Sequence, residues 1–135
     1  MESFVLLANL LLMAFLIWIY WKQTQIFNNQ LKLALYEKRI EIYFQLQHFL
    51  RIIANNEIMK TEDIVKFSRE VNTTSKFLFA SSESILKEID LIYNRGLSYH
   101  SEMSLNNNLK VIEIQKWAGN EFGILFELFK KSLEF

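Results

Sequence analysis

The run from Phe4 to Trp21, FVLLANLLLMAFLIWIYW, has no charged side chain, and no other feature of the sequence constrains the fold as strongly. As an α-helix it would be about 27 Å long, close to the roughly 30 Å hydrocarbon core of a bilayer. Asn9 is its one strongly polar residue. Because core helices are seldom apolar on every side, we predict a transmembrane anchor over residues 1–21, with a buried core helix as the alternative.

The residues at the end of this run are typical of a membrane interface. Trp18, Tyr20 and Trp21 are amphipathic rings that favour the headgroup level, and Lys22 can extend into the headgroups. A cleaved signal peptide is a second alternative. It is disfavoured because Met-Glu-Ser precedes the run without a basic residue and no small-x-small site precedes Lys22. We therefore expect an uncleaved anchor in contact with membrane lipid.

The flanking charges predict an orientation. Only Glu2 precedes the span, whereas Lys22, Lys32, Lys38 and Arg39 follow it. Positive residues favour the cytoplasmic side, so we expect a single-pass protein of the bacterial inner (plasma) membrane. Its amino terminus would lie outside and the rest of the chain in the cytoplasm. The absence of cysteine is compatible with that compartment.

We predict that the chain after the span forms a helical stalk, residues 22–33, followed by a helical bundle, residues 34–135. Four segments of the bundle place apolar residues at helical spacing. These stripes are Leu35, Ile42, Leu46, Phe49 and Ile53; Ile64, Phe67, Val71 and Leu78; Ile85, Ile89, Ile92 and Gly96; and Ile114, Ala118, Phe122, Leu125 and Phe129. Short connections favour antiparallel neighbours. The predicted fold class is all-α, with one amino-terminal transmembrane helix continuing into an antiparallel four-helix cytoplasmic bundle.

Polar residues predict the helix boundaries. Asn55-Asn56 ends the first bundle helix, and Thr61 is the expected N-cap of the second. That helix is expected to fray over residues 72–75, Asn-Thr-Thr-Ser, before Phe77. Ser81 or Ser82 would cap the third helix, and the last would run from about residue 109 to residue 133. Lys130-Lys131 most simply complements the carboxyl end of that helix, with lipid contact as the alternative.

Gly96 lies on the apolar stripe of the third helix. A glycine there either allows a neighbouring backbone to approach closely or is a tolerated defect. The sequence leaves both interpretations open.

Several kinds of chemistry find no support in the sequence. Lys plus Arg and Asp plus Glu each total 15, so the chain lacks the basic excess that nucleic-acid binding requires. There is no cysteine and no glycine-rich phosphate loop, and neither His48 nor His100 has a second ligand at metal-binding spacing. We therefore predict no catalytic, cofactor-binding or metal-binding residues and no nucleic-acid partner.

Two charged residues fall on apolar stripes. Arg39 lies four residues after Leu35 and three before Ile42, and Glu121 lies between Trp117 and Leu125. Because charged groups are rarely buried unless paired, we predict that Arg39 and Glu121 form a structural ion pair. The prediction assumes that residues 54 and 109 lie level at the end of the bundle far from the membrane, which puts Arg39 and Glu121 about 4.5 Å apart in height. The alternatives are that Arg39 pairs with Glu83 or Glu88 on the third helix, or that it extends outward alone.

Three motifs carry a resemblance to a family. They are Lys38-Arg39-x-Glu41-x-Tyr43, Phe77-Leu78-Phe79, and a carboxyl-terminal set of Trp117, Leu125, Phe129-Lys130 and Leu133-Glu134-Phe135. By their order and spacing, residues 36–135 resemble the widespread small bacterial membrane-anchored helical proteins of unknown function. Lys131-Ser132 departs from the family pattern, which often has Pro-Tyr there. The resemblance implies architecture and location, and no activity or cofactor.

The sequence thus favours a non-enzymatic, membrane-tethered interaction module that binds a protein partner or forms a homo-oligomer. One alternative is a membrane effector or sensor of a stress or phage-defence system. The span offers no pore-lining signal for that role, since it has neither a GxxxG motif nor a charge. A small-ligand carrier or enzyme that uses the bundle core is the third hypothesis.

Overall fold

The computed structural model describes residues 1–133, and in that range every element is helical, with no strand. The predicted all-α class is therefore confirmed. The chain forms two compact units, Met1–Tyr36 and Glu37–Phe135. Residues 134 and 135, the end of the third resemblance motif, lie outside the described range.

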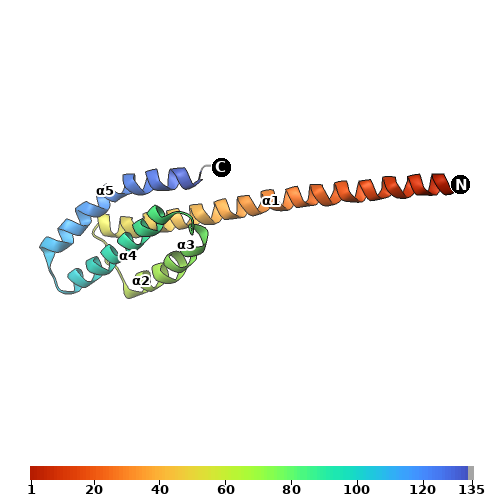
Figure 1. Cartoon of the computed structure of the whole chain (residues 1–135). Coiled ribbons are helices and arrows are strands. Elements are labelled where there is room, and N and C mark those ends of the chain that lie inside the picture. Colours follow the sequence, from red (N-terminus) through yellow and green to blue (C-terminus); the bar gives the residue numbers. More distant parts are fainter. Residues whose placement is uncertain (134–135) are drawn as a thin grey trace. The chain divides into compact units, whose positions relative to one another are not determined.

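The first unit is the amino-terminal part of helix α1, Glu2–Ala54 (Figure 1). Within residues 1–133, this helix alone is long and apolar enough to be a candidate membrane span, and none of its most apolar window is buried inside the protein. The ammonium of Lys22 lies 5.8 Å from the ring centroid of Trp18 and 5.7 Å from that of Trp21. The predicted interface residues Trp18, Trp21 and Lys22 thus form one cation–π cluster.

The second unit contains the rest of α1 and all the other helices. They are α2 (Thr61–Phe67), the π-helix η1 (Ser68–Asn72), α3 (Thr73–Leu78), α4 (Glu83–Ser104) and α5 (Asn108–Leu133). The first three follow one another without a break, so Thr61–Leu78 is one continuous helical segment. Helices α4 and α5 pack along each other, and α2 and η1 also contact α4 (Figure 1).

Most of the predicted stripe residues form the core of this unit. The buried ones are Ile42, Leu46, Phe49, Ile53, Ile64, Phe67, Val71, Ile85, Ile89, Ile92, Gly96, Ile114, Ala118, Leu125 and Phe129. Leu78 and Phe122 are partly buried against them, whereas Leu35 is exposed. Helical periodicity therefore identified the buried face of each helix correctly within the second unit.

Two predictions about the Thr61–Leu78 segment are wrong. Its N-cap is Lys60, whose amide donates to the Asp63 carboxylate at 3.0 Å. The segment also stays helical where fraying was expected. The hydroxyl of Thr73 donates to the Ser68 carbonyl and that of Ser75 to the Asn72 carbonyl, so these polar residues bond within the helix instead of competing with it.

The other boundaries agree with the polar residues in the sequence. Ser82 is the N-cap of α4, although its side chain makes no capping hydrogen bond. The turns after α1 and α4 contain Asn56 and Asn106, with φ of 55° and 54°. Asparagine tolerates this left-handed backbone better than most residues, which explains the asparagine runs at both turns.

Gly96 accommodates a side chain rather than a neighbouring backbone. A Cβ atom at this position would collide with the ring of Phe49, which is buried and packs on Phe67 at a centroid distance of 4.3 Å. Both interpretations of Gly96 from the sequence are therefore wrong. The glycine does not admit a neighbouring backbone, and it is not a tolerated defect, because its missing side chain makes room for the ring of Phe49.

Candidate functional site

Arg39 binds the ends of two helices. Its guanidinium donates to the carbonyl of Leu78, the last residue of α3, at 3.1 Å, and to that of Ser132, in the last turn of α5, at 3.3 Å. The same group lies 5.5 Å from the ring centroid of Phe79. Because helix carboxyl ends carry partial negative charge and unpaired carbonyls, an arginine stabilises both.

The predicted Arg39–Glu121 ion pair is therefore wrong, and the register of α5 is the reason. The prediction placed residue 109 level with residue 54. The structure instead joins Gln115 of α5 to the Ala54 carbonyl at 2.9 Å. Residue 115 rather than residue 109 is therefore level with Ala54, so α5 is shifted along α1 by nearly two turns, and Arg39 meets Ser132 rather than Glu121.

Glu121 lies against another acid, Glu88 of α4. Only 6% of Glu121 and 8% of Glu88 is exposed, and the two carboxyl groups share a hydrogen bond. Burial, together with the hydrogen bond and charge of Glu121, raises the pKa of Glu88 to about 8. At neutral pH the Glu88 carboxyl therefore holds its proton.

From the sequence alone, Glu88 is expected only as an alternative partner for Arg39. The signal that singled out Glu121 also applies to Glu88, which lies three residues after Ile85 and four before Ile92 on a buried stripe. Two acids on facing stripes do not predict a pair, because like charges repel and only opposite charges are expected to pair.

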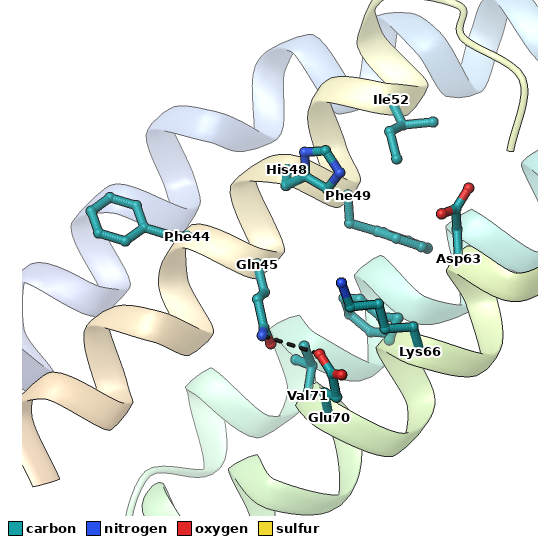
Figure 2. Close-up of a pocket in the computed structure, with 10 residues that line it drawn as sticks. Phe44, Gln45, His48, Phe49, Ile52, Asp63, Lys66, Glu70 and Val71 are labelled. Atoms are coloured by element: carbon teal, nitrogen blue, oxygen red, sulfur yellow. Dashed lines mark hydrogen bonds between the residues drawn. The ribbon is translucent and has the colours of Figure 1, made fainter.

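A pocket lies between α1 and the α2–η1 segment (Figure 2). Its volume is about 230 Å³. Apolar side chains form much of its wall, and polar ones surround them: Phe44, Phe49, Ile52, Phe67 and Val71, with Gln45, His48, Asp63, Lys66 and Glu70. Since an apolar cavity of about 150 Å³ can hold benzene, this pocket has room for one aromatic ring or a branched aliphatic side chain.

The polar residues of this pocket come from both sides. Gln45 of α1 donates to the Glu70 carboxylate at 3.3 Å across it (Figure 2). The amide oxygen of Gln45 is buried and accepts no hydrogen bond from residues 1–133. Phe44 lies at the pocket with 59% of its surface exposed. Such a site can surround an apolar group and offer an acceptor to a polar group beside it.

Within the described chain, no three His, Cys, Asp or Glu side chains lie close enough together to hold a metal ion. His48 is exposed at the pocket, and His100 binds the Met59 carbonyl through Nδ1 at 2.9 Å. The two histidines therefore have different settings, one in a pocket and one fastening the turn before α2 to α4.

Comparisons of the chain with models of protein families, with characterised proteins and with solved structures found no match.

Proposed function

We propose that this protein is a non-enzymatic, membrane-tethered interaction module. In this proposal, residues 4–21 of α1 cross the bilayer, and the second unit acts as an antiparallel four-helix bundle that binds a protein partner. The support for an anchor is the exposed apolar helix and its cluster of Trp18, Trp21 and Lys22. The resemblance to small bacterial membrane-anchored proteins is part of the same proposal.

The proposed orientation places the amino terminus outside the bacterial inner membrane and the bundle in the cytoplasm. Its basis is the excess of Lys and Arg after the span. Alkaline phosphatase, which is active only outside the cytoplasm, should be inactive when fused after residue 135 and active when fused before residue 1. Strong activity of the carboxyl-terminal fusion would contradict this orientation.

The pocket between α1 and α2 is the proposed docking site, and the exposed Phe44 beside it is the observation that carries the proposal. An aromatic side chain that stays more than half exposed next to an open apolar pocket is typical of a surface that a partner covers. We propose that a partner inserts one aromatic or aliphatic side chain here and donates a hydrogen bond to Gln45.

A photo-reactive phenylalanine analogue at position 44 tests this in intact membranes. We expect one discrete protein adduct from position 44 and none from position 124. Ile124 is a matched control on α5, with 49% of its surface exposed. Filling the pocket with Gln45→Trp should abolish the adduct while the helical content is retained.

The mass of the adduct identifies the partner class. A second copy of this chain would make the protein a homo-oligomer through this pocket. Equal adducts from positions 44 and 124, or an adduct that survives Gln45→Trp, would contradict the proposed site.

A further inference from the structure

We propose that α1 pairs with the α1 of a second copy of this chain, in parallel and in register, along the face that carries Asn9. This inference rests on the proposed membrane anchor and does not depend on the pocket between α1 and α2. Residues that follow Asn9 at steps of three or four positions share its side of the helix. They are Met13, Leu16, Tyr20, Thr24, Phe27 and Leu31, and together with Asn9 they form what we call the Asn9 face.

The side chain of Asn9 needs a partner in a bilayer. It is the one strongly polar residue of the apolar run, and it is exposed on the surface of α1. Within residues 1–133, no group forms a hydrogen bond with its carboxamide. By helical rise, Asn9 lies about 18 Å from Trp21 and about 7.5 Å from Phe4, so hydrocarbon surrounds it when these residues span the membrane. A carboxamide there is costly unless another group satisfies its hydrogen bonds.

A second copy of the chain supplies that partner. A carboxamide has both a donor and an acceptor, so two identical asparagine side chains can bind each other. Copies that insert into the membrane in the same orientation hold residue 9 at the same depth, and parallel pairing then brings each residue to its own counterpart. One asparagine in a pair of parallel helices also fixes their register.

Beyond the apolar run, the Asn9 face is suited to the same pairing. Phe27 and Leu31 have 64% and 50% of their surface exposed. The hydroxyl of Thr24 donates to the carbonyl of Tyr20 at 2.9 Å, so it is satisfied within its own helix. Both charged side chains between residues 22 and 35 are lysines that lie off this face. Two copies would therefore cover exposed apolar side chains without bringing like charges together.

The opposite side of the helix is less suited to pairing with itself. It carries Lys22, whose ammonium lies over the rings of Trp18 and Trp21. Ile26 follows Lys22 by four residues and Leu33 follows Ile26 by seven, so both lie on the side of this lysine. Parallel pairing there would bring the Lys22 ammonium groups of the two copies together, which is unfavourable.

Single introduced cysteines test which side pairs, because the chain has no cysteine of its own. Phe27→Cys and Leu31→Cys probe the Asn9 face. Ile26→Cys and Leu33→Cys are matched controls on the lysine side, where each wild-type residue has 55% of its surface exposed. The full chain is placed in phosphatidylcholine bilayers, mostly as monomers, and a disulfide-forming oxidant is added. We expect the first two variants to form disulfide-linked dimers several times faster than the two controls.

A change at residue 9 tests the part played by the carboxamide. Asn9→Leu keeps the run apolar, so the chain should stay in the bilayer, while the initial rate of dimer formation at Phe27→Cys falls about tenfold. Asn9→Gln retains a carboxamide and should keep most of that rate.

Extraction with alkaline carbonate separates the two proposals. A chain that carbonate releases from the bilayer contradicts the anchor, and the pairing is overturned with it. For a chain that stays in the bilayer, the anchor stands, and the pairing alone is overturned by any of three results. These are equal rates at all four cysteine positions, faster linkage at Ile26→Cys and Leu33→Cys, or an unchanged rate in Asn9→Leu.

Discussion

Replacing Glu88 with glutamine should remove a pH dependence from the stability of this protein. The pKa of Glu88 is raised from 4.5 to about 8 in the folded chain, so between these values the folded state holds a proton that the unfolded state has released. The resulting stability is fully present below about pH 4.5, and it is lost as the pH rises through about 8. The wild-type free energy of unfolding should therefore fall across this interval.

Glutamine keeps a hydrogen-bond donor for Glu121 and cannot ionise. We therefore expect the free energy of unfolding of Glu88→Gln to decrease less with rising pH than that of the wild type. Above pH 8 the variant should be the more stable protein. The gain should be roughly 2–3 kcal/mol, less than the ~5 kcal/mol of the full pKa difference, because water can enter around an ionised pair. Urea unfolding of the full chain in micelles, followed by helical ellipticity at several pH values, measures it.

One control variant shows whether the pH effect is specific to Glu88, and a second comparison tests whether Arg39 and Glu121 have separate partners. Glu113 is an exposed acid on α5, so Glu113→Gln should keep the wild-type pH profile. Arg39→Met should destabilise the protein through the lost helix-end bonds, and its effect should add to that of Glu121→Gln, since these residues have separate partners. If the free energy of unfolding of Glu88→Gln still falls with pH as steeply as that of the wild type, groups other than Glu88 cause the pH dependence.

Two glycine-to-alanine substitutions should have opposite effects. In an open helix the change stabilises by up to about 1 kcal/mol, which we expect for Gly119, where a new Cβ meets nothing within 4 Å. At Gly96 the same Cβ collides with the ring of Phe49, which also packs on the ring of Phe67. Gly96→Ala should therefore destabilise by roughly 1–3 kcal/mol.

A double variant tests the cause of the Gly96 effect. Phe49→Leu shortens the side chain that occupies the glycine position, so it should make Gly96→Ala less harmful than it is beside phenylalanine. Thermal unfolding of the four proteins of this cycle gives the coupling. Equal effects of Gly96→Ala and Gly119→Ala would mean that the ring moves aside without cost.

The sequence alone determined which elements form and which of their faces are buried. An uninterrupted apolar run predicted the exposed first part of α1, and helical spacing predicted the buried faces that hold Leu46, Ile89 and Leu125. Asparagine and serine residues predicted the breaks after α1, before α4 and after α4, although the polar run at residues 72–75 also predicted fraying where the chain stays helical. These features are local, because a periodicity or a cap depends only on residues a few positions apart.

Only the tertiary structure decided which side chains meet. A helix can slide along its neighbour by whole turns without changing its buried face, so periodicity gave no register. The hydrogen bond from Gln115 to the Ala54 carbonyl shows the register that α5 adopts, and in that register Arg39 lies at two helix ends. Glu121 lies beside Glu88, and no local pattern shows that burial next to a second acid raises the pKa of Glu88, since this depends on how far apart two separate helices hold the carboxyl groups.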